Sequence, residues 1–426
     1  MDEGIIYIDA YYIPEDEQCP ICGSINLYKN GTITKTVKHC TYHTTLFLVT
    51  CHIQAYKCKV CNKIFYEKDT FSNPKETLSK ETIFIILEKL KSANVAFESV
   101  ARDLHLSRQN VINVFDRYID YTPGSLPEIL SFDEKHINKN MTENVYLFII
   151  VDFKEIEIYD IINSRHKYTL ERYFSRFPLE ERQKVKFITM DMWEPYLDVA
   201  KRYFRNAKIA IDSFHVITTI NNAMDKVRLS VMQKYNLKTD NLDDNHPYYY
   251  ILKKFRYYLT TELDNLTDKR FYNRKMKTWF DKQSLIKYIL DIDERLSKAY
   301  NLASRYREFN KTASYEQAKD ELEILIDDFY HSQLPSFYEV AKTLSNWKEH
   351  ILNSFITIPD CLTKPKKKDE QPKERRLSNG AIEGLNAILE KININGNGYS
   401  NFWRFKNRAI YTINRNVPIL NTPKKK

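Results

Sequence analysis

The stretch 185-VKFITMDMWEPYLDVAKRYFRNAKIAIDSFHV-216 decides the fold of this chain. Its first apolar, strand-like run stops at Asp191, and its second stops at Asp212. The residues between the two runs show helical periodicity, and Pro195 stands in the expected first turn, where proline is tolerated. An order of buried strand, helix and buried strand is typical of α/β folds.

Three more strand-like runs precede this unit, at residues 129–136 (ILSFDEKH), 144–153 (NVYLFIIVDF) and 156–165 (IEIYDIINSR). Short turns separate them, which predicts antiparallel neighbours, because antiparallel strands need only a tight connection. A helical pattern follows over residues 168–177. Three antiparallel strands and then alternating helix and strand is the order of an RNase H-like α/β core, which we therefore predict.

Acidic residues stand at three well-framed places along this core. Asp133 and Asp191 end strand-like runs, whereas Glu383 lies on a helical stretch just after the polar triplet SNG. Hard divalent cations prefer such oxygen ligands, and two ions about 3.5–4 Å apart cut and join phosphodiesters. We predict that these three acids are catalytic and hold two Mg²⁺ or Mn²⁺ ions.

Each of these acids taken alone is weak support, since an aspartate at a strand end is often a cap or turn residue. Asp152, Asp160 and Asp198 fit similar descriptions. The combination of three acids, in this order and with these flanks, favours the catalytic interpretation.

Two further positions carry a supporting role. Asp212 and His215 form an Asp-x-x-His pair after the last core strand, and His215 is placed to bind phosphate or to orient Asp212. A buried structural pair is the alternative. Trp193, next to Asp191, is predicted to stack on an unpaired DNA base, with packing in the core as the alternative.

The N-terminal part of the chain carries two Cys-x-x-Cys pairs, Cys19 with Cys22 and Cys58 with Cys61. Each pair places two thiolates on one turn, and two such turns complete a tetrahedral Zn²⁺ site. The stretch between them alternates like a small antiparallel sheet. We predict a structural zinc module over residues 1–72. A cysteine or histidine between the pairs replacing one ligand is the alternative, whereas a redox role would need a βαβ pattern that is missing here.

Residues 73–120 show the pattern of a helix-turn-helix domain. One helix is expected after Ser79 and another after Ser107, because serine is a preferred N-cap, and a short helix lies between them. The last helix of such a motif enters the DNA major groove. A plain three-helix bundle has the same periodicity and remains the alternative. The side chains predicted to contact DNA are Arg108, Gln109 and Asn113.

A long region separates the last core strand from Glu383. It is polar, aromatic and helically periodic, so we predict an all-α insertion domain at residues 219–372 that divides the core into 128–218 and 373–426. Its basic-aromatic stretches could follow a DNA backbone, form a dimer contact or be solvated helix faces. The charged segment 364–376 is interpreted as a phosphate-facing loop or a solvated linker.

The C-terminal block combines a last core helix with a basic tail. Residues 395–408 (NGNGYSNFWRFKNR) concentrate aromatic and basic side chains, which predicts a surface for a DNA end beside the metal site. The residues predicted to contact DNA there are Tyr399, Trp403, Arg404, Lys406 and Arg408.

Composition narrows the class of protein. The chain has 65 Lys and Arg against 56 Asp and Glu, and this net charge of +9 fits a polyanion partner, although a Lys-rich coding bias gives the same excess. Glycine-loop nucleotide motifs are missing, and no apolar run approaches the roughly 20 residues that span a bilayer. We therefore expect an α+β multidomain protein of the cytoplasm, with thiols or metal ligands in place of disulfides.

At these flanks the chain resembles DDE transposases of the ISL-three family of bacterial insertion sequences. The resemblance covers nearly the whole length, from the cysteine pairs and the helix-turn-helix to the blocks FDEKH, MDMWEPY, IDSFHV and SNGAIEGLNAILEKININGNGYSNFWRFKNRAI, of which the last is the most specific. It implies Asp133 and Asp191 as the two metal-binding aspartates and Glu383 as the third acid. The continuation HINKN after the first block is a mild departure that leaves the acids intact.

The resemblance implies a nucleoid-associated transposase. Such a protein binds the terminal inverted repeats of an insertion sequence as double-stranded DNA, cleaves the ends with metal ions and joins them to target DNA. A homodimer is expected, because two ends must be handled together. Two other functions stay open: a non-catalytic DNA-binding regulator derived from a transposase, which needs no triad, and a structure-selective RNase H-like nuclease, which leaves the N-terminal modules without a purpose.

Overall fold

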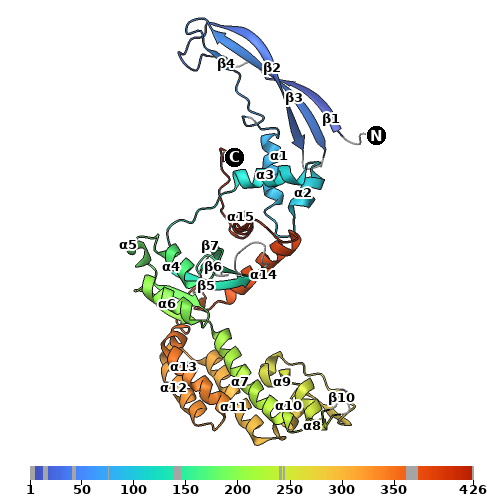
Figure 1. Ribbon diagram of the computed structural model, residues 1–426, viewed down its shortest axis with the longest axis vertical. Helices are drawn as coiled ribbons and strands as arrows, with labels where there is room; N and C mark the ends of the chain where they lie inside the picture. The colour runs from blue at the N-terminus through green and yellow to red at the C-terminus, as the bar shows by residue number, and fades with distance from the viewer. Residues whose placement is uncertain are drawn as a thin grey trace. The chain divides into compact units, whose positions relative to one another are not determined.

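The computed structural model describes residues 5–12, 18–40, 45–74, 76–137, 145–238, 242, 245–360 and 373–424. The chain forms two compact units (Figure 1): a terminal unit (Met1–Pro123, Ile137–Val145, Gly384–Lys426) and a central unit (Gly124–His136, Tyr146–Glu383). Residues 384–426, predicted as the end of the core, thus group with the N-terminal modules. Cys361 and most of the charged segment 364–376 lie outside the described residues.

A five-stranded mixed sheet, with strands in the order β7-β6-β5-β8-β9, forms the heart of the central unit. Strands β5, β6 and β7 pair antiparallel, and β8 and β9 run parallel to β5. This topology confirms the order predicted for an RNase H-like core. The strands are β5 (Ile129–His136), β6 (Tyr146–Asp152), β7 (Glu157–Ile162), β8 (Phe187–Met190) and β9 (Lys208–Ile211).

The two faces of this sheet are covered differently, because successive side chains of a strand point to opposite faces. On one face Phe132 packs against Phe174 of α4 (Lys167–Phe174), and Phe148 packs against Tyr196 of α6 (Glu194–Tyr203). A short helix, α5 (Leu179–Arg182), lies between α4 and α6 in the chain. The opposite face carries a smaller apolar cluster of Ile129, Phe153, Ala210, Ile358 and Leu377.

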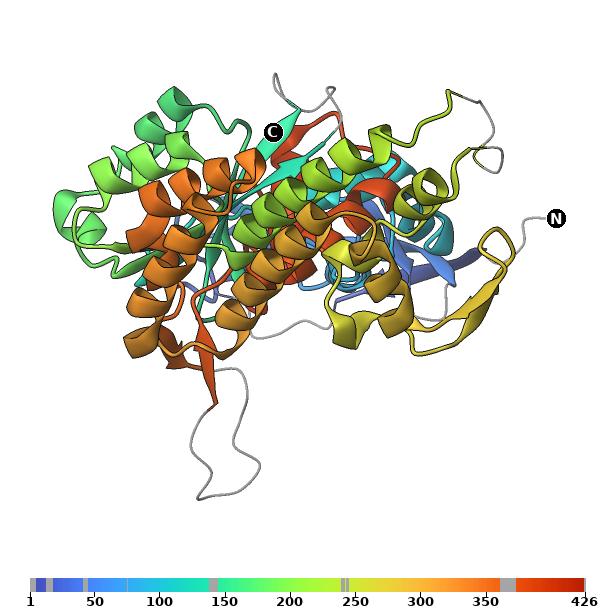
Figure 2. The ribbon, with the colours of Figure 1, turned by 90° about the horizontal axis from the view of Figure 1, so that it is seen from below.

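A helical region follows directly after β9. Helix α7 (Ser213–Gln233) runs side by side with α11 (Glu294–Thr312), as Figure 2 shows, and α13 (Pro335–Asn353) contacts α7, α12 (Tyr315–Tyr330) and strand β9. The remaining elements are α8 (Pro247–Lys254), α9 (Tyr257–Thr260), the 3₁₀ turn η2 (Leu263–Asn265) and α10 (Lys282–Leu290).

Two features depart from the all-α insertion that the sequence predicted at residues 219–372: strand β12 (Thr357–Pro359) and a short hairpin. Strands β10 (Phe271–Asn273) and β11 (Thr278–Phe280) form an antiparallel hairpin beside α10. Strands of three residues are too short for a period-2 pattern to be distinguished from a helical one, which is why the sequence did not predict them.

The chain then returns to the sheet. Strands β12 (Thr357–Pro359) and β13 (Glu374–Arg376) pair antiparallel, and α14 (Gly380–Asn395) follows. The first four residues of α14 belong to the central unit and the rest to the terminal unit.

The terminal unit contains a second sheet, in which β1 (Ile5–Tyr11) pairs parallel with β3 (Leu46–Cys58), while β2 (Leu27–Cys40) and β4 (Ile64–Tyr66) pair antiparallel with β3. The long β2–β3 pair confirms the antiparallel sheet expected between the cysteine pairs. Val37, Val49 and Cys51 form its small buried core.

Three helices follow this sheet: α1 (Lys80–Lys89), α2 (Phe97–Asp103) and α3 (Arg108–Tyr118). Ser79 accepts a hydrogen bond from the Thr82 backbone and Ser107 from the Asn110 backbone, which confirms both predicted N-caps. Helix α15 (Phe402–Ile413) packs against this bundle through the edge-on contact between Tyr411 and Phe115.

Candidate metal centres and nucleic-acid contacts

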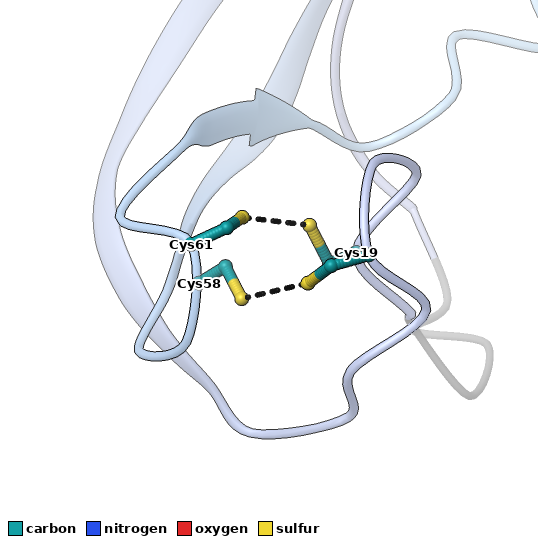
Figure 3. Close-up of side chains that lie close together, drawn as sticks. Cys19, Cys58 and Cys61 are labelled. Atoms are coloured by element: carbon teal, nitrogen blue, oxygen red, sulfur yellow. Dashed lines mark hydrogen bonds between the residues drawn. The ribbon is translucent and has the colours of Figure 1, made fainter.

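Four thiols meet at one end of the β2–β3 sheet. In Figure 3, Cys58 and Cys61 face Cys19, which lies on the turn before β2. The Cys19 and Cys61 sulfur atoms are 3.5 Å apart, those of Cys22 and Cys58 are 3.6 Å apart, and all four lie within 4.8 Å of one another. Sulfur atoms about 2.3 Å from one Zn²⁺ in a tetrahedron would be about 3.8 Å apart, so this spacing fits a Cys₄ zinc site.

Local backbone geometry prepares these thiols for a metal. Hydrogen bonds from the backbone N–H groups of Cys61 and Val60 lower the pKa of the Cys58 thiol to about 6, which favours the thiolate that zinc binds. Gly23 follows the first pair with a φ of 69°, a conformation that glycine adopts without strain. Both features come from the tight turns that the Cys-x-x-Cys spacing predicts.

The other cysteines described in this unit have different surroundings. Cys40 is buried and its thiol hydrogen-bonds the Leu104 carbonyl at 3.0 Å, and Cys51 is buried in the core of the sheet. Neither joins the group of four thiols, so the alternative in which one of them replaces a ligand is not supported. His43, another candidate between the pairs, lies outside the described residues.

Three aspartates form a row across the central sheet. The strand register pairs Ser131 with Thr189 between β5 and β8, and Met190 with Ile211 between β8 and β9. Continued by one or two residues, it sets Asp133 beside Asp191 and Asp191 beside Asp212. Parallel strands thus bring carboxylates that are far apart in the chain to one edge of the sheet.

His215 closes this row from the first turn of α7. Its Nδ1 atom lies 3.2 Å from Asp191 Oδ1 and 3.6 Å from Asp212 Oδ2. Burial and the nearby Asp133 carboxylate raise the pKa of Asp191 to about 7. The nearby Asp212 carboxylate, together with that of Asp191, raises the pKa of His215. Burial and the neighbouring carboxylates thus disfavour the charged form of Asp191, an effect that a bound cation would offset.

The donor set of this row fits a divalent ion. The oxygen ligands of Asp191 and Asp212 and a ring nitrogen of His215 lie within 4.8 Å of one another. The His215 Nδ1 atom is buried and, among the described residues, makes no hydrogen bond of good geometry. The two carboxylates suit Mg²⁺ or Mn²⁺, and the imidazole beside them suits a transition metal such as Mn²⁺ better than Mg²⁺. Asp212 and His215, predicted only as supporting residues, therefore lie with Asp191 in one compact group of potential ligands.

Glu383 lies in the first turn of α14, and its side chain is exposed. With a rise of about 1.5 Å per residue, it is roughly one helical turn beyond Asn379, whose backbone N–H lies 3.3 Å from Asp212 Oδ1. Glu383 and Asp133 both remain outside the compact group of three ligands. Of the three predicted acids, only Asp191 lies in the compact group. Asp133 neighbours it in the sheet, and Glu383 is on helix α14.

Asn379 is the residue of this site that the sequence did not single out. It is buried, its Nδ2 donates to the Phe132 carbonyl at 3.0 Å and lies 3.4 Å from Asp191 Oδ1, and its Oδ1 accepts from the Thr189 hydroxyl at 2.6 Å. It therefore ties the start of α14 to strands β5 and β8. The sequence feature that could have identified Asn379 is its position just before a predicted helix, where asparagine is a favoured N-cap.

The rival acids named from the sequence are engaged in structural contacts. Asp160 accepts a hydrogen bond from the Tyr173 hydroxyl at 2.7 Å, and Asp198 pairs with Lys167 at 2.7 Å. Asp152 caps a turn by accepting from the Lys154 backbone at 2.9 Å. These partners explain the acids without a metal.

Glu134, the neighbour of Asp133, points into an aromatic cluster. Both its oxygens accept from Arg165 Nη1 at 2.7 Å, and one accepts from the Tyr196 hydroxyl at 2.9 Å. The Arg165 guanidinium lies over the Trp193 ring at 5.0 Å, and Trp193 also contacts Tyr196 edge-on at 4.4 Å. These contacts favour the packing role for Trp193 over the predicted stacking on a DNA base.

The residues of the terminal unit that are predicted to contact DNA bases lie on the first two turns of α3. Arg108 and Gln109 are exposed, and Gln109 Nε2 donates to Asn113 Oδ1 at 2.8 Å. The N-cap at Ser107 leaves these polar side chains at the helix N-terminus, free of the apolar face formed by the buried Val111.

The C-terminal residues predicted to contact DNA have contacts of another kind. Arg404 forms an ion pair with Asp116 of α3 at 2.6 Å, and Arg408 is buried and donates to the carbonyls of Ser92 and Val95 at 2.9 Å. These contacts are with the three-helix bundle of the same unit. They favour a structural role for Arg408.

The other three residues of that prediction differ in exposure. Tyr399 packs edge-on against Phe97 and Phe405, and Lys406 is buried. Trp403 is 66% exposed and remains the best DNA-contact candidate on α15.

Comparison with known proteins agrees with the sheet topology and the row of carboxylates. Residues 130–360 match the model of a transposase family, that of the ISL-three (ISL3) DDE transposases. The match covers more than half of the chain, so the chain belongs to this transposase family. Within the described residues, no helix combines the length and the apolar character needed to cross a membrane.

A curated relative points in the same direction. The chain is 25% identical over 222 residues to the "Insertion element ISM1 uncharacterized 48.3 kDa protein" of Methanobrevibacter smithii. The similarity covers 48% of this chain and 52% of the relative, so the chain spans about half the length of the curated protein that it matches.

Proposed function

We propose that this protein is an active DDE transposase. It binds the terminal inverted repeats of its insertion sequence, cleaves the DNA at the repeat boundaries and joins the freed 3′-hydroxyls to target DNA. The observation that carries this proposal is the row of Asp133, Asp191 and Asp212 across three neighbouring strands, with His215 facing it.

The proposed catalytic acids are Asp133, Asp191 and Glu383, as the family resemblance implies, and Asp212 and His215 complete the ligand set. Two Mg²⁺ or Mn²⁺ ions, when bound, would activate the attacking oxygen and stabilise the leaving oxygen. The neighbouring residues position the acids: Asn379 holds the Asp191 carboxylate and the start of α14 in place.

Arg165 acts on the charge of the site through Glu134. It neutralises Glu134, so the acid directly beside Asp133 is already paired. The ion pair offsets part of the Glu134 charge, and Glu134 makes only a minor contribution to the raised pKa of Asp191. The negative charge available to a metal ion thus comes from the acids at the sheet edge, because Glu134 is already paired with Arg165.

DNA recognition is proposed for the terminal unit. Helices α2 and α3 act as a helix-turn-helix, with Arg108, Gln109 and Asn113 at the major groove. The Cys₄ site holds the turns of the neighbouring sheet through a structural Zn²⁺. We propose a homodimer acting on the nucleoid, because two element ends must be cut together.

The test is cleavage and joining of an end-labelled duplex that carries the terminal repeat of the element. The wild-type chain is compared with Glu383→Gln in Mg²⁺ or Mn²⁺. Metal-dependent cutting at the repeat boundary that the variant loses supports the proposal. Tight binding without cutting by either protein contradicts it and favours a regulatory DNA-binding protein, and cutting without joining favours a nuclease.

A further inference from the structure

The hairpin β10–β11 presents two aromatic rings to solvent. Tyr272 and Trp279 are directly opposite each other in the antiparallel register, with ring centroids 5.5 Å apart. Their exposed fractions are 49% and 57%. Single exposed apolar side chains are ordinary, but here two large rings lie side by side on one face of a hairpin, inclined at 58° to each other, and form an exposed aromatic pair.

These two rings are not needed to hold the hairpin in place. Side chains alternate along a strand, and the opposite face of the hairpin carries Phe271 and Phe280. Phe271 stacks on Phe255 at 5.6 Å, and Phe280 is buried and packs against Tyr288 of α10 at 5.5 Å. The inner face therefore anchors the hairpin, and the outer face is left for another partner.

The hairpin is also strongly basic. Residues 269–279 contain five basic residues and no acidic residue, in a chain whose net charge is only +9. The nearest preceding acids are engaged elsewhere, Asp268 with Lys282 at 2.9 Å and Asp264 with Lys311 at 3.3 Å. The five basic residues are Lys269, Arg270, Arg274, Lys275 and Lys277.

Side-chain to backbone hydrogen bonds hold the turn between the strands. The buried Asn273 side chain accepts hydrogen bonds from the backbone N–H groups of Lys275 at 3.0 Å and Met276 at 3.1 Å. Lys277 completes the turn with a φ of 51°. A surface that is ordered before binding loses less conformational entropy when its partner arrives.

A groove of about 560 Å³ adjoins the hairpin, lined by residues that include Lys254, Phe271 and Arg274. The groove combines apolar walls with cationic rims, and Lys254 is held there by a hydrogen bond to the Tyr250 hydroxyl at 2.8 Å. Its volume lies within the range of about 300–1,000 Å³ that is usual for sites of small ligands, so it can receive a nucleotide.

We propose that the outer face of this hairpin binds a DNA strand whose bases are unpaired, with Tyr272 and Trp279 stacking on the bases and the basic residues contacting phosphates. Aromatic platforms flanked by cations are how proteins hold single-stranded nucleic acid. In fully paired DNA the faces of the bases are covered by stacking. Such DNA would contact the basic side chains of the hairpin but not the rings of Tyr272 and Trp279. The inference rests on the proposed function only for the identity of the polyanion as DNA.

The experiment measures binding of the full-length chain to two labelled duplexes by fluorescence anisotropy, without added Mg²⁺. Both carry the same terminal repeat, and one has its last few base pairs mismatched so that the strands separate. We expect Trp279→Ala to weaken binding to the separated end by about tenfold, since stacking on one base contributes roughly 1–3 kcal/mol. Binding to the fully paired duplex should stay within about twofold.

Two further variants keep this test decisive. Trp279→Phe retains a ring and should restore most of the affinity for the separated end, which excludes a loss caused by misfolding. Tyr315→Ala removes an aromatic side chain that is 46% exposed elsewhere in the central unit, and it should change neither affinity. Equal binding of wild-type and Trp279→Ala to the separated end overturns the inference.

The outcome is separable from that of the proposed function. Ring-dependent binding to separated ends by a protein that never cuts DNA would contradict the transposase proposal and leave the inference standing. Normal cutting and joining by a protein whose Trp279→Ala variant binds separated ends as tightly as the wild type would overturn the inference alone.

Discussion

Asn379 Nδ2 lies 3.4 Å from Asp191 Oδ1, although the two residues are 188 positions apart in the chain. The same asparagine accepts from Thr189, whose hydroxyl is 2.6 Å from that of Ser131 on the neighbouring strand. A continuous chain of polar contacts thus links strands β5 and β8 to the start of the helix that carries Glu383.

This link predicts the effect of removing the Asn379 amide. Asn379→Ala should lower the rate of DNA cleavage by about ten- to hundredfold, as is usual for residues that orient metal ligands. The concentration of Mn²⁺ that gives half-maximal cleavage should rise, which a purely structural role would not cause. Asn301→Ala, at an exposed position of α11, is the matched control. Unchanged metal dependence in Asn379→Ala would sink this role.

The row of acids predicts which variants stop catalysis without loss of DNA binding. Asp133→Asn, Asp191→Asn and Glu383→Gln should each reduce cleavage of the terminal repeat below detection, because each removes a metal-binding charge. Binding measured by gel shift should persist. Asp198→Asn serves as the control, since its exposed pair with Lys167 contributes little. A fully active variant at any of the three positions would remove that acid from the site.

The compact ligand group makes a separate prediction about metal affinity. His215→Ala and Asp212→Asn should each weaken Mn²⁺ binding by about tenfold or more, measured by isothermal titration of the zinc-loaded protein. The cause is the loss of one of three ligands within 4.8 Å. If the alternative of a buried structural pair holds, stability falls and Mn²⁺ affinity of the folded protein stays the same.

The four thiols predict a zinc-dependent terminal unit. Cys58→Ser should abolish binding of one Zn²⁺ per chain, measured by native mass spectrometry, and should weaken binding to the terminal repeat. Structural zinc sites supply folding free energy, so the melting temperature should fall as well. Cys361→Ser, which changes a thiol outside the group of four, should keep the metal. Full zinc content in Cys58→Ser would contradict the Cys₄ assignment.

Arg408 predicts a loss of stability in place of a loss of DNA contact. Its guanidinium satisfies several backbone carbonyls around the α1–α2 connection, so Arg408→Ala leaves buried acceptors without donors. We expect a loss on the order of 3 kcal/mol in the free energy of unfolding of the terminal unit, measured with urea. Trp403→Ala, at an exposed site on the same helix, should leave stability nearly unchanged and weaken DNA binding. The reverse pattern would restore the prediction made from the sequence.

Local patterns in the sequence anticipated much of this structure. The strand order of the core, the N-caps at Ser79 and Ser107 and the pairing of the cysteine turns all follow from short-range rules of period, capping and spacing. The cysteine prediction succeeded because four thiols on two tight turns have few other arrangements. These features depend on residues that are close in sequence, or on one contact between two simple turns.

The tertiary structure alone decided how distant residues meet. Asp212 and His215 lie close to Asp191 because of the register between β8 and β9, which is set by pairing between residues far apart in the chain. The burial of Arg408 depends on carbonyls more than 300 positions away, and basic residues look alike in sequence whether they face solvent or backbone. Sequence by itself therefore determined the class of chemistry and the order of elements, because these are written in local patterns. Which acids lie close together and which basic side chains are buried were decided by packing, because burial and partner choice belong to the folded chain.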